Sequence, residues 1–246
     1  MKKVLQKIAQ KFRIAAENNA SVAEPYDFNK SNPLGGGGER VDIQLNKKID
    51  FEKLDIYQKS HYSRYEFAKQ KIDNNEVCGD FACGTGYGSI MLSQKAKNVI
   101  GADLDKTVIE EIKKRYSNNS KVTFLNENLL NLNYNQYFDT IVSFETIEHF
   151  KEEDIYTLFS IFNKALQPGG KLIFSTPYHQ EKTEDAVKMG FHLTFYITES
   201  VIKKWLAVTG FNLLEFNYQN YQDHQIVSEL NSKDFIITVC QKKMEA

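Results

Sequence analysis

Asp80-Phe81-Ala82-Cys83-Gly84-Thr85-Gly86-Tyr87-Gly88 joins a short apolar run to a helical pattern. Glycines at such a strand-to-helix turn let the backbone approach a ligand and adopt dihedrals that other residues resist. In the next predicted strand, GADLD places Asp103 at the carboxyl end. Asp103 follows at close to the ~20-residue spacing expected of a carboxylate that accepts hydrogen bonds from ribose hydroxyls. The two motifs together predict a nucleotide site at one edge of a sheet.

Strand and helix patterns alternate on both sides of this turn. Such alternation predicts an α/β, Rossmann-like, doubly wound fold with a mostly parallel seven-stranded sheet and helices on both faces. A turn at 167–170 is expected to lead into the fifth strand. The predicted strands are 77–81, 99–104, 122–125, 140–144, 171–175, 212–217 and 234–241, and the predicted helices are 56–72, one after Gly86, 106–116, 153–166 and 198–208.

The chain before this pattern, residues 1–50, reads as an extension of a domain that covers 51–246. Apolar residues at helical spacing, with lysines opposite, predict an amphipathic helix over 2–16. The helix would pack on the domain or on a second subunit in a homodimer, and a membrane-surface helix is the alternative. Four successive glycines, 35–38, predict a loop that serves as a linker or as a substrate lid.

Bulk composition excludes several classes of protein. The 246 residues carry 31 Lys and Arg against 32 Asp and Glu, a formal net charge of −1. Proteins that grip nucleic acid usually show a basic excess or stripe, so no nucleic-acid partner is expected. No apolar run approaches the ~20 residues of a membrane span, and no integral membrane contact is predicted. The three cysteines form no cluster, which suits reduced thiols in the cytoplasm.

The turn itself discriminates between nucleotide ligands. Counted from Gly84, the last glycine of a dinucleotide GxGxxG motif is replaced by Ser89. Asp80 precedes the turn, and its negative charge suits a cationic ligand with an ammonium and a sulfonium better than a pyrophosphate. S-adenosylmethionine (SAM) is therefore favoured over NAD as the cofactor.

Several signatures occur in the order typical of one family. The stretch from about Ser60 to Ser175 contains DFACGTGYG, GADLD, NENLLNL, FDTIVSFETIEHF and LQPGGKLIFSTP. In this combination the chain resembles the class I SAM-dependent methyltransferases. Two positions depart from the family pattern, because Ala82 replaces the usual Gly and Asn128 the usual Asp. Both substitutes are small or isosteric, and Asn can still accept a hydrogen bond through its carbonyl.

The resemblance implies a cofactor site built from these motifs. Asp80 would contact the amino group of SAM, and Asp103 would bind the ribose. Asn128 would face the adenine amino group, and Glu145 would line the pocket beside the sulfonium. The implied cofactor-binding set, which includes the two leucines beside the adenine, is Tyr57, Arg64, Asp80, Ala82, Gly84, Gly86, Asp103, Leu104, Asn128, Leu129 and Glu145.

A narrower resemblance involves the segments GERVD and SHYSRYEFAKQKI. With the motifs above, they are similar to bacterial methyltransferases that decorate surface polysaccharides. The resemblance implies that Arg64, in RYEFA, reaches the SAM carboxylate, for which a guanidinium is the natural bidentate partner. A solvated arginine on a helix face is the alternative.

Catalytic candidates lie at the carboxyl edge of the sheet, where substrates bind in open α/β folds. A sugar hydroxyl would benefit from a general base, whereas a phosphate oxygen is already anionic. His149 is the first choice because the motif alignment places it nearest the sulfonium, and its alternative role is a structural hydrogen bond. Glu148 is a catalytic candidate too, or it orients His149 or caps the next helix. The remaining candidates are His179 and His192, with His61 and His224 behind them.

The acceptor pocket is expected to be walled by residues 177–196, which are too aperiodic for a core element. Phe191 and Tyr196 would offer flat surfaces to a sugar or base. Arg40 would contact an acceptor phosphate as the N-terminal loop closes. No metal site is predicted, and the side chains that leave a cation conceivable are Asp105, Glu145, Glu148 and His149.

The sequence thus predicts a SAM-dependent methyltransferase acting on a small acceptor. The expected methyl acceptor is a sugar hydroxyl or phosphate-type oxygen of a nucleotide-linked or surface-polysaccharide precursor. Three alternatives stay open: N-methylation of an amino-sugar nucleotide or other metabolite, a noncatalytic SAM-binding protein, and an NAD-dependent oxidoreductase.

Overall fold

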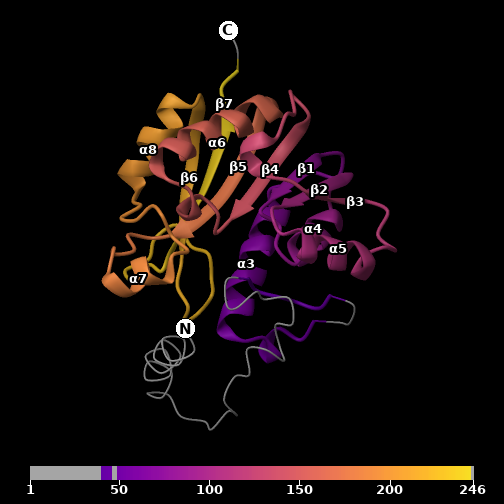
Figure 1. Cartoon of the computed structure of the whole chain (residues 1–246), viewed down its shortest axis with the longest axis horizontal. Helices are drawn as coiled ribbons and strands as arrows, with labels where there is room; N and C mark the ends of the chain where they lie inside the picture. Colours follow the sequence, from indigo (N-terminus) through magenta and orange to yellow (C-terminus); the bar gives the residue numbers. More distant parts are fainter. Residues whose placement is uncertain (1–39, 46–48, 245–246) are drawn as a thin grey trace.

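A seven-stranded sheet in the order β3-β2-β1-β4-β5-β7-β6 forms the centre of the molecule (Figure 1). The computed structural model describes residues 40–45 and 49–244. Neighbouring strands from β3 to β5 pair in parallel, while β7 runs antiparallel to both β5 and β6. The predicted mostly parallel sheet is confirmed. Its strands are β1 (Val77–Phe81), β2 (Asn98–Asp103), β3 (Val122–Asn126), β4 (Phe138–Phe144), β5 (Leu166–Pro177), β6 (Phe211–Gln219) and β7 (Phe235–Lys242).

Helices cover both faces of this sheet (Figure 1). Helices α3 and α4 pack on one face, α6 and α8 on the other, and α5 packs against β3. No helix among the described residues is both long enough and apolar enough to cross a bilayer. The helices are η2 (Phe51–Lys53), α3 (Ile56–Gln70), α4 (Tyr87–Ser93), α5 (Lys106–Arg115), η3 (Leu129–Asn131), η4 (Ile147–His149), α6 (Glu152–Ala165), α7 (Glu184–Met189) and α8 (Glu199–Val208).

The central strands are apolar on both sides because both faces are covered. Leu172 and Phe174 of β5 pack with the cluster under α6 and α8, whereas Ile173 between them packs with the cluster under α3 and α4. Successive strand residues point to opposite faces, so each cluster takes alternate residues. All three side chains are fully buried.

The structure differs from the sequence prediction at the start of β5. Residues 167–170, predicted as a turn before the strand, form a bulge within it. Leu166 pairs with Phe138, and the next pair is Lys171 with Thr140, so one residue of β4 lies opposite four of β5. Gly169, at φ +75°, supplies the left-handed residue that the bulge needs.

Helix α7 was missed by the sequence prediction, although its capping signals are present. The Thr183 hydroxyl accepts a hydrogen bond from the backbone N–H of Ala186 at 3.1 Å, and Gly190 ends the helix at φ +72°. Only six residues lie between these caps. A helix this short does not show a clear periodicity.

The end of the N-terminal extension packs on the domain. The Asp42 carboxylate, which is fully buried, pairs with both terminal nitrogens of Arg115 at 2.6 and 3.1 Å. Gln58 donates to the Asp42 carbonyl at 2.8 Å, and the neighbouring Ile43 is 1% exposed. The predicted helix over 2–16 and the glycine run at 35–38 lie outside the described residues, so the division at residue 50 stays a prediction.

Arg115→Met is expected to lower the free energy of unfolding by about 2 kcal/mol, because it leaves the buried Asp42 carboxylate without its counter-ion. Lys114→Met is the matched control on the same helix, since Lys114 is 72% exposed and its loss should cost under ~0.5 kcal/mol. Urea unfolding of both variants measures the difference. Equal effects would show that the ion pair does not anchor this segment.

Candidate functional site

Asp80, at the end of β1, holds the glycine turn together. Its carboxylate accepts hydrogen bonds from the hydroxyls of Tyr65 at 3.0 Å and Ser89 at 2.5 Å. The side chain is fully buried, and burial raises the pKa of Asp80 to about 6 against the lowering effect of both hydrogen bonds. The residue that breaks the dinucleotide motif, Ser89, is thus a direct partner of the acid. Each carboxylate oxygen keeps a second lone pair that is available to a ligand ammonium. The contact with that ammonium stays a prediction.

The hydrogen bond from Tyr65 depends on a glycine in α4. A Cβ at Gly88 would lie 2.0 Å from the Tyr65 ring, far inside van der Waals contact. The ring therefore lies directly on the helix backbone, where it also meets Tyr87 and Phe144 edge-on at centroid distances of 5.4 and 5.0 Å. The sequence motif ended at Gly88, but its role in seating Tyr65 could not be seen from spacing alone.

The glycine turn itself adopts left-handed backbone conformations. Gly84 and Gly86 have φ of +50° and +76°, and the Gly84 N–H donates to the Asp103 carboxylate at 2.9 Å. The glycine turn and Asp103 are thus in direct contact, and ribose binding by Asp103 stays a prediction. Ala82, the departure from the family pattern, has φ +61°, where an L-residue is strained by roughly 1–2 kcal/mol.

Arg40 lies at the ribose acid. Its guanidinium pairs with Asp105 at 3.2 Å and approaches Asp103 at 3.9 Å. A Cβ on Gly84 would lie 3.8 Å from the Arg40 side chain, so the arginine covers the glycine turn. These two carboxylates attract Arg40 to the predicted ribose acid, and its contact with an acceptor phosphate stays a prediction.

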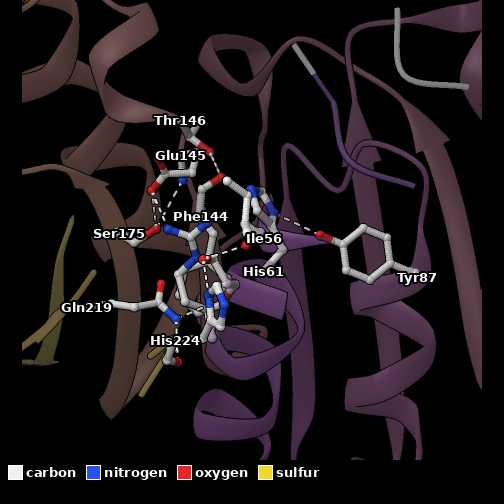
Figure 2. Close-up of polar contacts among 11 residues, drawn as sticks. Ile56, His61, Tyr87, Phe144, Glu145, Thr146, Ser175, Gln219 and His224 are labelled. Atoms are coloured by element: carbon white, nitrogen blue, oxygen red, sulfur yellow. Dashed lines mark hydrogen bonds and ion pairs between the residues drawn. The ribbon is translucent and has the colours of Figure 1, made fainter. Parts of the chain in front are cut away.

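Arg64 and Glu145 form the second half of the predicted cofactor site. Arg64 is fully buried, pairs with Glu145 at 3.1 Å and stacks on the Phe235 ring at 4.4 Å. The solvated arginine is therefore excluded. Glu145, at φ +50° after β4, also accepts from the Ser175 hydroxyl at 2.6 Å (Figure 2). Nε and Nη2 of Arg64 are buried without a partner among the described residues, and such donors fit a ligand carboxylate.

His61 also lies beside this arginine. Its Nδ1 is 2.8 Å from the Tyr87 hydroxyl at the start of α4 (Figure 2). Burial, and secondarily the Arg64 charge, hold the pKa of His61 well below its usual value. His61 was only a minor candidate from sequence, because nothing in its spacing links α3 to the glycine turn.

The residues predicted around the adenine have mixed surroundings. Leu104 is 70% exposed, whereas Leu129 is 6% exposed within the core. The side-chain oxygen of Asn128 caps η3 by accepting a hydrogen bond from the Leu130 N–H at 3.0 Å. The side-chain NH₂ group is left for other contacts. Tyr57 is half-buried, with its ring edge-on to Tyr221 at 5.4 Å.

Three of the four predicted catalytic residues come together beyond β4. Ligand atoms of Glu148, His149 and His192 all lie within 4.8 Å of one another, although His192 comes from the loop after α7. His149 Nδ1 is 2.8 Å from the Phe191 carbonyl, and His192 Nδ1 is 2.5 Å from the Gln180 side-chain oxygen. Burial, together with His149, lowers the pKa of His192 to about 4.

Glu148 has neither of the two structural roles expected as alternatives to catalysis. The carboxylate has no hydrogen-bond partner in the described part of the chain, and it neither orients His149 nor caps α6, whose N-cap is Lys151. Its side chain is 1% exposed. Burial, reinforced by the Glu145 carboxylate, raises the pKa of Glu148 well above its usual value.

The remaining histidines lie apart from this cluster. His179 is exposed, with its ring 5.6 Å from that of Tyr196. His224 is buried and its Nδ1 lies 3.0 Å from the Ser60 hydroxyl, a structural contact. Phe191 and Tyr196, the expected acceptor surfaces, are 37% and 47% exposed.

Part of the chain is similar to known proteins. Residues 79–170 match a family model described as a methyltransferase domain. A probable S-adenosylmethionine-dependent methyltransferase of Mycolicibacterium smegmatis is 29% identical over 120 residues, 47% of this chain and 45% of that protein. A probable thiol methyltransferase of Arabidopsis thaliana is 32% identical over 95 residues, 37% of this chain and 42% of that protein. The chain thus spans less than half the length of these two curated relatives.

Solved structures share the fold. The N-methyltransferase NodS from Bradyrhizobium japonicum, in complex with S-adenosylhomocysteine, superposes with a TM-score of 0.59 at 16% identity. The superposition covers 81% of this chain and 94% of NodS. Together the matches indicate a methyltransferase domain over residues 79–170 and a fold shared with a solved methyltransferase.

Gly88→Ala is expected to lower the free energy of unfolding by more than ~2 kcal/mol, because its methyl group would displace the buried Tyr65 ring. The same substitution in a Tyr65→Ala background should cost under ~1 kcal/mol, since the ring is gone. Chemical denaturation of the four proteins completes the cycle. Additive effects of the two substitutions would contradict the contact.

Proposed function

We propose that this chain is a SAM-dependent methyltransferase that transfers the methyl group to an oxygen of a small acceptor. The proposed acceptor is a sugar hydroxyl or a phosphate-type oxygen of a nucleotide-linked or surface-polysaccharide precursor. One observation carries the cofactor part: Arg64 presents two buried nitrogens that have no partner at 40–45 or 49–244. They lie beside Glu145, which follows β4, the neighbour of the strand that leads into the glycine turn. A ligand carboxylate would satisfy them.

The protein's charges suit each end of such a cofactor. Arg64 would bind the carboxylate, and Asp80 and Glu145 would attract the ammonium and the sulfonium. Asp103 would accept from the ribose hydroxyls while the Gly84 N–H holds its other oxygen. When bound, SAM supplies an electrophilic methyl group. The protein aligns donor and acceptor for in-line displacement.

The acceptor side has a group that can take up a proton. A carbonyl oxygen only accepts hydrogen bonds, so the Phe191 carbonyl requires the proton on Nδ1 of His149. Nε2 then carries the lone pair and can act as general base toward a hydroxyl. The exposed rings of Phe191 and Tyr196 provide apolar surface for a sugar. The cytoplasm is the proposed location, which three free, buried cysteines suit.

Binding and turnover test the two parts separately. Calorimetry with SAM, S-adenosylhomocysteine and NAD should give binding of the first two and none of NAD. The SAM-loaded protein is then incubated with a panel of sugar nucleotides and phosphorylated glycans, and mass spectrometry detects a gain of one methyl group. NAD binding without SAM binding would overturn the cofactor assignment. SAM binding without any methylated sugar would overturn the acceptor assignment alone.

The affinity for SAM should fall at acid pH because Asp80 titrates near 6. Protonation removes the negative charge that attracts the ammonium, so Kd is expected to rise about tenfold between pH 7 and pH 5. Asp80→Asn should bind SAM more weakly at pH 7 and show a much flatter pH profile. Calorimetry across this range measures both. An unchanged slope in the variant would assign the titration to another group.

His149→Ala should reduce kcat by about 10²–10⁴-fold while SAM affinity stays within twofold, because the residue acts on the acceptor. His179→Ala is the matched control, since His179 is exposed and apart from the cluster. Methyl transfer to the acceptor found in the screen gives kcat. Full activity of the first variant would remove His149 from catalysis.

A further inference from the structure

Glu148, His149 and His192 together have the composition of a metal site. One carboxylate oxygen and one nitrogen from each ring lie within 4.8 Å of one another. Glu148 and His149 belong to η4, directly after β4, and His192 lies in the loop between α7 and α8. Backbone hydrogen bonds join the two elements, since the N–H groups of Leu193 and Thr194 donate to the Glu148 carbonyl at 2.7 and 3.1 Å.

Hydrogen bonds set the tautomer of both imidazoles. Nδ1 of His149 faces the Phe191 carbonyl, and Nδ1 of His192 faces the Gln180 side-chain oxygen. Because the Phe191 carbonyl only accepts, and the Gln180 oxygen does likewise, each Nδ1 carries the proton and each Nε2 a lone pair. Metal-bound histidines in proteins commonly hold their second nitrogen in this way.

The Glu148 carboxylate independently points to a ligand. It is 1% exposed, and neither oxygen makes a well-formed hydrogen bond in the described part of the chain, where the nearby Thr176 hydroxyl is itself without a partner. A buried, unpartnered carboxylate is costly, and a cation would remove that cost. The neighbouring Glu145 carboxylate differs in this respect, because it already accepts hydrogen bonds from Arg64 and Ser175.

We propose that Glu148, His149 and His192 bind one divalent transition-metal ion, which activates the acceptor oxygen. Two imidazoles and one carboxylate suit Mn²⁺, Fe²⁺, Co²⁺ or Zn²⁺ better than Mg²⁺, which prefers oxygen ligands. Three protein ligands leave coordination positions open for an acceptor hydroxyl. His149 reaches the surface, so an acceptor can approach from that side.

The catalytic part of this inference rests on the proposed methyl transfer. The ion lowers the pKa of the acceptor hydroxyl, whose proton passes to solvent. The oxygen then attacks the methyl carbon of SAM. The new O–C bond forms as the C–S bond breaks, and its electron pair stays on sulfur in neutral S-adenosylhomocysteine. In this arrangement His149 acts as a metal ligand and not as a lone general base.

Cobalt binding to the full chain tests the site without any acceptor. After removal of metals with a chelator, Co²⁺ is titrated in and followed by its visible absorption and by calorimetry. We expect one Co²⁺ per chain, displaced by Zn²⁺. Glu148→Gln, His149→Ala and His192→Ala should each weaken binding at least tenfold, and His179→Ala should leave it unchanged. Thermal unfolding confirms that each variant is folded.

A second variant distinguishes ligands from a merely polar cluster. Gln180→Ala removes the oxygen that orients His192 and should weaken Co²⁺ binding about tenfold. The site would be overturned if the wild-type protein bound no Co²⁺. It would also be overturned if the three ligand variants bound Co²⁺ as tightly as the wild-type protein does. Co²⁺ bound without SAM binding would overturn the proposed function and leave the metal site standing. SAM-dependent methylation that is unaffected by chelator would overturn the metal's catalytic role and restore His149 as the base.

Discussion

The buried carboxylate of Asp80 is the contact on which the cofactor half of the site depends. A charged group without solvent needs donors, and the molecule supplies them from two helices, through Tyr65 of α3 and Ser89 of α4. Those hydrogen bonds hold both helices against the end of β1 and so set the path of the glycine turn. The turn then places the Gly84 N–H against Asp103. Sheet edge, turn and acid are thereby fixed relative to one another.

The fold was largely predictable because its strands are separated by strong local signals. Short apolar runs located β1 to β4 within about two residues of their observed ends, the usual uncertainty of such boundaries. Two elements were not predictable in this way. The bulge at 167–170 was predicted as a turn because Pro168 and the two glycines after it are typical of turns and of bulges alike. Only the pairing of these residues with β4 distinguishes the two structures. Helix α7 is too short to show a period, so its caps alone could have indicated it.

The sequence indicated candidate site residues but not their contacts. Motif position pointed to Asp80, Asp103 and Glu145, because each lies at or just after the carboxyl end of a strand, at the edge where ligands bind. The partners of those acids come from distant segments, as Tyr65, Ser175 and Arg40 do, and no spacing rule connects them. His192 was a minor candidate from sequence. Its proximity to Glu148 and His149 follows from the chain returning after α7, which only the folded structure shows.

The segment at 40–45 has a consequence for cofactor exchange. Arg40 lies within ion-pairing reach of the carboxylate proposed for the ribose, and Thr85 in the glycine turn donates to the Val41 carbonyl at 2.9 Å. Docking of this segment and occupancy of the nucleoside position are therefore linked equilibria, each altering the other by the same factor. A partner or ligand that pulled the segment away would change the nucleoside affinity without touching the nucleoside.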